Sequence, residues 1–420
     1  FLVILLILCF QPGQVSAQTG VEYINKVYMK HLHSVRMLVG EWETSYPVIE
    51  MNSEAGLVFS FDDIEAGQKD FEYTVIHCNS DWKPSNLQFF EYAEGFEYNS
   101  IREISSSRNT FVAYTHYSLQ LPNEDLQLKY SGNYLLVVYQ HDGNEQKIAC
   151  TWRFMMYENA LPVTAGVYQP AGSLYDTGQK LSFVINRTNY SLFDPSRELK
   201  VVIMQNNQSY NAISGLQPTF MNNNELVYDY EDKQTFTASN EYRYFSTRNV
   251  KVLSERVKSI QFKNPYYYIE LFPESPAYFD KYSSREDING HYVIKSDLHT
   301  VIDENTDVDY SMVHIVCNMS RLPDNNKVYV FGALSGWEFS DACEMKYNAD
   351  LKAYESLLML KQGYYNYRYV VRTPDGTDQS LFEGSHWATE NDYQIFVYHD
   401  DISAGYERLV GYTKVNSRNR

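Results

Sequence analysis

The chain has 420 residues, of which 44% are hydrophobic and 15% aromatic, and its 35 basic and 53 acidic side chains give a formal net charge of −18. This composition supplies several packed cores and excludes a disordered chain, and the length predicts about two to four domains. The acidic excess also argues against binding to nucleic acid, which requires clustered lysine and arginine.

The first segment of the chain is apolar. An uninterrupted apolar run covers Phe1–Phe10, and Val15–Ala17 follows with the small residues of a cleavage site. This run is too short to span a membrane, so we interpret residues 1–17 as a signal peptide, truncated at its start because no Met or basic residue precedes it. Cys9 does not fit a lipidation site, since it does not end the run after small residues. No later stretch reaches the roughly 18 apolar residues of a spanning helix. We expect an exported, soluble mature chain.

The commonest pattern in the rest of the chain is a period-two alternation rich in Tyr, Val, Ile and Phe, which is typical of strands with one buried face. Turn-forming residues separate the strands, and no helical stripe of three turns or more is present. The sequence therefore predicts an all-β protein of tandem immunoglobulin-like β-sandwich domains. The clearest strand patterns are LVFSFDD (57–63), FEYTVIHC (71–78), YLLVVYQ (134–140), KLSFVIN (180–186), LKVVIMQ (199–205), YYYIELF (266–272), KVYVFGAL (327–334), YNYRYVVR (365–372) and YQIFVYHD (393–400).

Two polar segments divide these strands into three modules. Residues 158–162 follow a strand that ends in WRFMMY, and the acidic residues 303–307 precede the strand pattern YSMVHIVC. We expect an N-terminal β-sandwich over residues 18–160, a middle β-sandwich over 161–310 and a C-terminal module over 311–420.

Four cysteines follow the signal segment: Cys78, Cys150, Cys317 and Cys343. In an exported protein four thiols allow up to two disulfides, and the sequence alone leaves three pairings open. We favour Cys78 with Cys150 and Cys317 with Cys343, because each bridge then lies within one expected domain.

The stretch IHCNSDWKPSNL, residues 76–87, gathers residue types that occur in active sites. His77 and Cys78 are neighbours on a predicted strand, so their side chains point to opposite faces and do not act on the same atom. The strand ends in a turn-forming trio whose last residue, Asp81, is expected to accept backbone N–H groups. Trp82 is expected to fold back as an apolar plug. We interpret these four residues as a structural motif.

The other candidate constellations are incomplete. His31 and His33 share a face at strand spacing, but two ligands do not make a zinc site. No Gly-x-Ser-x-Gly nucleophile motif occurs. The acidic pairs Asp62-Asp63, Asp303-Glu304 and Asp400-Asp401 are expected to be solvated residues of strand ends and loops, not a glycosidase pair. The sequence thus provides no catalytic residue, no metal ligand set and no cofactor site, and it favours a protein that is not an enzyme.

Five blocks follow one another along the N-terminal module. They are FSFDD, YTVIHCNSDWKPSNLQFFEYAEGF, SRNT, TFVAYTHYSLQLPNE and SGNYLLVVY. Together they resemble the plug protein family of the type IX secretion system of Bacteroidota-type bacteria. The resemblance covers most of the chain after the signal segment and is densest between Leu57 and Tyr139.

This resemblance implies a periplasmic protein without enzymatic activity or cofactor. Its implied partner is the giant outer-membrane translocon barrel of the secretion system, with no nucleic acid and no direct membrane span. The implied task is to lie under the periplasmic mouth of the barrel and to close it when no substrate is passing. Tyrosine-rich sheet edges are one expected means of contact with the barrel.

A second resemblance concerns the C-terminal module. Residues 328–376 are similar to early-set immunoglobulin-like modules related to glycogen-binding domains, and Trp337 stands where such modules have an aromatic residue after a glycine-containing turn. A second aromatic residue near Asp375-Gly376 would complete a sugar-stacking platform, but Phe382 and Trp387 come later in the chain. Trp337 and Trp387 are candidates for a glycan or interface contact, and we favour core or interface for Trp337. A periplasmic or cell-surface glycan-binding protein is the alternative function.

Overall fold

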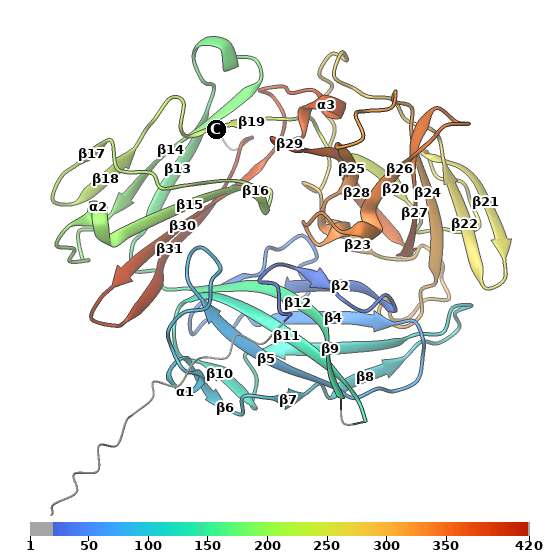
Figure 1. Ribbon diagram of the computed structural model, residues 1–420, viewed down its shortest axis with the longest axis horizontal. Coiled ribbons are helices and arrows are strands. Elements are labelled where there is room, and N and C mark those ends of the chain that lie inside the picture. The colour runs from blue at the N-terminus through green and yellow to red at the C-terminus, as the bar shows by residue number, and fades with distance from the viewer. Residues whose placement is uncertain (1–19, 144, 419–420) are drawn as a thin grey trace, which may run out of the picture.

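The computed structural model describes residues 20–143 and 145–418, so the expected signal segment lies outside the described residues. Within them 49% of the residues lie in β-strands and 5% in helices, and the three α-helices are short. This confirms the predicted all-β class of sandwich domains. The sheets form three domains, which lie at the corners of a triangle and meet near its centre (Figure 1). None of the helices in the described part of the chain is long and apolar enough to cross a membrane.

Domain 1, residues 20–158, is a sandwich of two main sheets. One sheet has the order β1-β12-β11-β5-β7, with β3 parallel to β12, and the other has the order β2-β4-β9-β8. Alternation along β4 directs Leu57, Phe59 and Phe61 into the core between the sheets. The elements are β1 (Lys26–Val27), β2 (Leu32–Val39), β3 (Val48–Glu50), β4 (Leu57–Asp63), β5 (Phe71–Cys78), α1 (Phe89–Tyr92), β6 (Ala93–Gly95), β7 (Asn99–Ser100), β8 (Glu103–Ser106), β9 (Thr115–Leu121), β10 (Leu126–Leu128), β11 (Gly132–Asp142) and β12 (Glu145–Tyr157).

Domain 2 is built from two separate segments, residues 159–239 and 389–418. Its sheets have the orders β13-β14-β18-β17 and β16-β15-β30-β31, so β30 from the end of the described chain pairs with β15 from its middle, and β31 pairs with β30. In this pairing Val201 lies opposite Val397, and both are buried in the domain core. The elements are β13 (Val163–Tyr168), the 3-10 helix η1 (Gly172–Leu174), β14 (Gly178–Asn186), α2 (Pro195–Glu198), β15 (Leu199–Gln205), β16 (Gln208–Ser214), β17 (Phe220–Met221), β18 (Glu225–Tyr228), β19 (Thr235–Thr237), β30 (Asp392–Asp401) and β31 (Tyr406–Asn416).

Domain 3, residues 240–388, is inserted between the two segments of domain 2. Its strands form one ten-stranded sheet with the path β20-β28-β25-β26-β27-β24-β22-β21, which encloses a second core. The elements are β20 (Arg243–Ser246), β21 (Val257–Lys263), β22 (Tyr266–Leu271), β23 (Tyr292–Ile294), β24 (Tyr310–Cys317), β25 (Lys327–Phe331), the 3-10 helices η2 (Ala333–Ser335) and η3 (Asp341–Cys343), β26 (Glu344–Asn348), β27 (Ala353–Lys361), β28 (Gly363–Thr373), β29 (Gly376–Asp378) and α3 (Ser380–Glu383).

The expected domain boundaries differ from this arrangement in two places. A middle module over 161–310 would contain β21 and β22, but β21 pairs with β22, and β22 pairs with β24 in domain 3. A C-terminal module over 311–420 would contain β30 and β31, which instead complete domain 2. Both differences have one reason: alternation identifies a strand, but the sheet edge that the strand joins is decided by tertiary pairing.

Candidate functional site

The motif at residues 76–87 lies where domain 1 meets domain 2. His77 is buried at the end of β5, and its Nε2 donates a hydrogen bond to the Ser131 carbonyl at 3.1 Å. The ring contacts Tyr134 of domain 1 and Tyr406 of domain 2 edge-on, with centroids 5.1 and 5.4 Å apart. Burial lowers the pKa of His77 to about 4. The imidazole is therefore neutral at neutral pH and has no access to a substrate.

The other three residues of the motif also serve local structure. The Cys78 side chain is buried, and the exposed Asp81 accepts the Lys83 backbone N–H at 3.1 Å. Trp82 adopts a left-handed backbone conformation, and the Arg153 guanidinium lies 4.3 Å from the centre of its ring. In the same turn, the Ser80 N–H donates to the carboxylate of Glu407 in domain 2. The motif is thus part of the junction between domains 1 and 2.

Substitution of His77 by glutamine is expected to change the pH dependence of stability. The pKa of His77 is about 4 in the folded chain and ordinarily about 6.5 in an unfolded one, so the unfolded chain binds more protons between these values. The contribution of His77 to the free energy of unfolding is complete above about pH 6.5 and is lost as the pH falls toward 4. The unfolding free energy of the parent relative to His77→Gln should fall by on the order of 3 kcal/mol between pH 7 and pH 4, measured by urea unfolding.

The exposed His299 provides the matched control, and His299→Gln should follow the parent at every pH. If the unfolding free energies of the parent and of His77→Gln changed with pH in parallel, the pKa of His77 would be the same in the folded and the unfolded chain.

All four cysteines in the described residues are buried and unpaired, so the expected disulfides are wrong. Cys78 on β5 pairs with Asn133 of β11, whereas Cys150 on β12 pairs with Val138 on the opposite edge of β11. Positions 133 and 138 are about 16 Å apart along a strand, well beyond the roughly 7 Å between Cα atoms that a disulfide allows. Burial raises the pKa of the Cys78 thiol to about 12. The thiols pack as small apolar groups.

Trp337 is part of a buried cluster. It is 7% exposed and meets the rings of His291 and Phe331 edge-on, with centroids 5.6 and 6.2 Å apart. The loop that carries it is joined to domain 1, because the Asn25 side-chain amide donates to the Gly336 carbonyl at 3.0 Å. A sugar ring therefore finds no free indole face at this position. Trp387 is half-buried and packs against the core of domain 2.

The histidine pair considered as metal ligands is split in the structure. His33 contacts the Tyr310 ring, whereas His31 lies near Asp63 and Glu65, with ligand atoms within 4.8 Å of one another. The Lys69 ammonium already lies 2.7 Å from Asp63 and 2.6 Å from Glu65. This ammonium forms ion pairs with both carboxylates and offsets one of their two negative charges.

Asp62 and Asp63 are buried within β4, so the expectation that this acidic pair is solvated is wrong. Asp62 lies at the junction between domains 1 and 3, where the ammonium of Lys361, from the end of β27, is 2.6 Å away and both side chains are 1% exposed. His116 Nδ1 and the Tyr310 hydroxyl each lie 2.6 Å from the same carboxylate. Burial alone would raise the pKa of Asp62, but Lys361 and His116 lower it to about 2.

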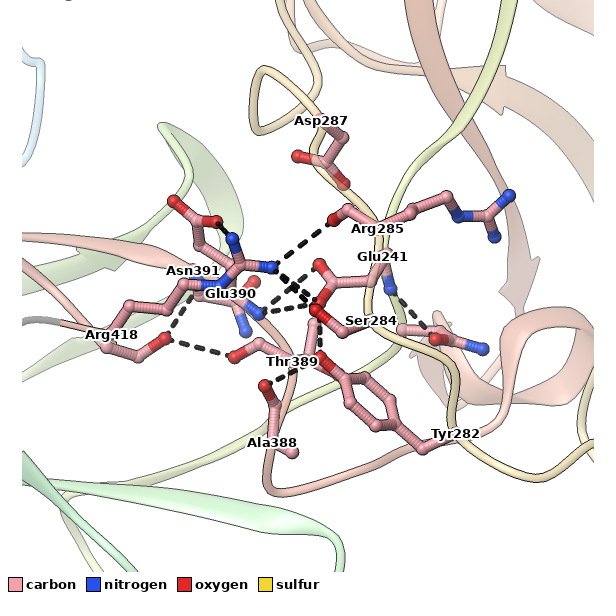
Figure 2. A network of polar contacts seen from close by, with 12 residues as sticks. Glu241, Tyr282, Ser284, Arg285, Asp287, Ala388, Thr389, Glu390, Asn391 and Arg418 are labelled. Carbon is pink, nitrogen blue, oxygen red and sulfur yellow. Dashed lines mark hydrogen bonds and ion pairs between the residues drawn. The ribbon is translucent and has the colours of Figure 1, made fainter.

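The junction between domains 2 and 3 is closed by Arg418, two residues after β31. Figure 2 shows its guanidinium between Glu390 of domain 2 and a loop of domain 3. The ion pair with Glu390 measures 2.7 Å, and the guanidinium donates to Ser284 Oγ at 3.3 Å and to the Arg285 carbonyl at 3.2 Å. A further contact of 3.4 Å reaches the Glu241 carboxylate. The end of the described chain thus ties the two domains together.

Two carboxyl groups lie near this clamp, of which Glu241 is buried and Asp287 is half-buried. Glu241 also accepts the Tyr282 hydroxyl at 2.5 Å (Figure 2), whereas Asp287 accepts the backbone N–H groups of Tyr242 and Asn289. Burial raises the pKa of Glu241, and it raises the pKa of Asp287 to about 6. Each group is held by hydrogen bonds from its own surroundings. Both carboxylates thus stabilise the local structure of this junction.

A surface cleft of about 520 Å³ lies between domains 1 and 2. Tyr130 and Tyr406 stack on one another in its wall, with centroids 4.7 Å apart. Arg408 in the wall forms ion pairs with Glu158, also in the wall, and with Asp401. These ion pairs stabilise the junction.

Sequence reasoning did not identify the residues at the domain junctions. Asp62 and Lys361 are separated by 299 positions, and Glu241 and Arg418 by 177. No local pattern marks such a pair, because each member resembles an ordinary charged residue of a strand end. Only the motif at residues 76–87 could be recognised in the sequence, because its density of polar and aromatic residues is unusual for a strand and turn.

Comparison with known proteins agrees with this description. Residues 32–158 match the family model described as the type 9 secretion system plug protein 1st domain. A solved structure of a hypothetical protein from Parabacteroides merdae is 32% identical, with 94% of this chain and 100% of that chain covered and a TM-score of 0.91. The C-terminal domain of the Streptococcus pyogenes antigen I/II-family protein AspA covers 92% of this chain and 99% of its own, but at 9% identity and a TM-score of 0.17 it supports no argument. Among curated proteins there is no match.

Proposed function

This chain belongs to the type 9 secretion system plug protein family, and on that premise we propose that it caps and seals the periplasmic opening of the outer-membrane translocon barrel when no substrate is passing. Family membership gives it a plug role in type IX secretion, at the cell envelope, in association with a component of that system. The barrel as partner, the periplasmic side and the sealing of the opening are the parts that we propose.

The observation that carries the proposal is the joining of all three domains through buried polar contacts. The Lys361–Asp62 ion pair connects domains 1 and 3, the Gln208 side chain donates to the Tyr242 hydroxyl between domains 2 and 3 at 2.9 Å, and the Tyr398 hydroxyl donates to the Asn133 side chain between domains 1 and 2 at 2.8 Å. Separating any two domains would leave buried polar groups without partners, which is strongly unfavourable. The three domains therefore behave as one rigid body, as the occlusion of a wide pore requires.

We also propose that the protein acts without catalysis. The buried ionisable groups at the junctions are engaged in internal hydrogen bonds and ion pairs, which stabilise the arrangement of the domains. A blocking function requires bulk, rigidity and a complementary surface, and it requires no reactive group. A stable cap on the barrel should bury on the order of 1,200–2,000 Å² in total.

The proposal is tested by the permeability of the outer membrane. Deletion of the gene for this chain should increase the entry of a large antibiotic that the intact membrane excludes, and expression of the parent chain should reverse the effect. Deletion of both this chain and the translocon barrel should remove the leak again, because the leak passes through the barrel. An unchanged permeability in the single deletion, or a leak that persists without the barrel, would contradict the proposal.

A further inference from the structure

A short stretch of domain 1 displays two phenylalanine rings to solvent. Phe90 in α1 is 72% exposed, and Phe96, just after β6, is 73% exposed. Their neighbours behave differently: Phe89 packs against the core of domain 1, and Tyr92 is buried and donates its hydroxyl to the Val75 carbonyl. Phe89 and Tyr92 thus pack in the core of domain 1, whereas Phe90 and Phe96 do not.

The backbone that carries the two rings is held in place by domain 1. The Lys129 ammonium donates to the Phe90 carbonyl at 2.6 Å, and β6 pairs with β10. The Phe96 N–H donates to the Asp125 carbonyl, and its own carbonyl accepts the Asn99 side chain at 2.7 Å. Gly95 has a positive φ of 116°, and an added Cβ would lie 2.0 Å from the Asp125 carbonyl oxygen. The rings are therefore presented by a fixed backbone.

Two exposed carboxylates lie beside these phenylalanines in the sequence. Glu94 and Glu97 are exposed, and within the described residues no basic side chain forms an ion pair with either of them. The nearby Arg102 is paired with Asp125 at 3.0 Å. We call Phe90, Glu94, Phe96 and Glu97 the acidic-aromatic edge. The elements that carry it, α1 and β6, lie at the side of domain 1 that faces away from domains 2 and 3 (Figure 1).

We propose that the acidic-aromatic edge is a docking surface for a protein segment that carries lysine or arginine next to apolar side chains. Exposure of two fixed phenylalanine rings contributes nothing to folding, whereas burial of such rings is a frequent source of binding free energy at interfaces. The unpaired carboxylates select a cationic partner and orient it. An anionic lipid surface is disfavoured, because it would repel the exposed carboxylates of Glu94 and Glu97.

This inference rests on the proposed function, in which the segment belongs to the periplasmic rim of the translocon barrel. Solubilised envelopes that contain a tagged barrel are combined with the parent chain, with Phe90→Ser/Phe96→Ser, or with Glu94→Lys/Glu97→Lys. Both double variants should bind the barrel about tenfold more weakly or worse. The control is Phe193→Ser, which removes a phenylalanine that is 98% exposed on domain 2, and it should bind as the parent does. All variants should keep the thermal stability of the parent, because the substituted side chains are exposed.

A photo-crosslinking residue at position 96 provides the second measurement. It should join the chain to a barrel segment that contains lysine or arginine, while the same residue at position 193 should not. Full binding by both double variants would overturn the docking surface and leave the proposed function intact. A parent chain that does not bind the barrel would overturn both. A crosslink at position 96 to lipid alone would assign the edge to the membrane and overturn the protein partner.

Discussion

Replacement of Lys361 by methionine is expected to lower the free energy of unfolding by about 3–5 kcal/mol. The ammonium of Lys361 is the cationic partner of Asp62, and both side chains are 1% exposed at the junction between domains 1 and 3. Removal of the ammonium leaves a buried carboxylate that keeps only the His116 and Tyr310 donors. The loss should appear in urea unfolding at pH 7.

The pH dependence of this loss identifies its cause. In the parent the pKa of Asp62 is about 2, below its ordinary value of about 3.9, so the stabilisation by the ion pair is complete above about pH 4 and is lost as the pH falls toward 2. In Lys361→Met, burial favours the neutral acid and thus raises the pKa of Asp62. The loss of stability should therefore be smaller at pH 4 than at pH 7.

Two control variants accompany Lys361→Met. The Lys83–Asp81 ion pair lies on the surface, and Lys83→Met should change stability by less than about 1 kcal/mol. The double variant Asp62→Asn/Lys361→Met removes both charges and should recover part of the loss. A loss below about 1 kcal/mol in the single variant would mean that water reaches Asp62 and that the junction is not closed.

Trp337→Ala is expected to destabilise the chain by about 3–5 kcal/mol. The indole is buried beside His291 and Phe331, and alanine would leave a cavity where domain 3 meets domain 1. Trp42, which is 58% exposed, is the matched control, and Trp42→Ala should change stability by less than about 1 kcal/mol. Thermal unfolding of the parent and the two variants measures the difference.

The same pair of variants separates packing from sugar recognition. If Trp337 stabilises the core, polysaccharide in a native gel should not retard the parent chain, because the buried ring offers no stacking face. Equal melting temperatures for Trp337→Ala and Trp42→Ala, together with retardation of the parent that Trp337→Ala abolishes, would identify Trp337 as an accessible sugar contact.

The sequence by itself determined the features that depend on neighbouring residues. Period-two alternation identified the strand of residues 71–78, and this alternation alone places the side chains of His77 and Cys78 on opposite faces. Such alternation is a local property, because successive side chains of a strand point to opposite faces of the sheet whichever strand it pairs with. The all-β class and the family blocks could be recognised for the same reason.

Only the tertiary structure decided which distant residues meet. In the sequence Asp62 resembles a solvated residue at a strand end, and only the fold brings Lys361 of β27 to it. The thiol of Cys78 on β5 has no disulfide partner, because β11 lies between β5 and β12 and the register of these strands places Cys150 far from Cys78. Domain 2 is completed in the same way by distant residues. The strand of residues 199–205 has a free edge until β30, from the end of the described chain, pairs with it, and β31 follows β30. Pairing across hundreds of residues is set by the packing of whole sheets, and no local pattern records it.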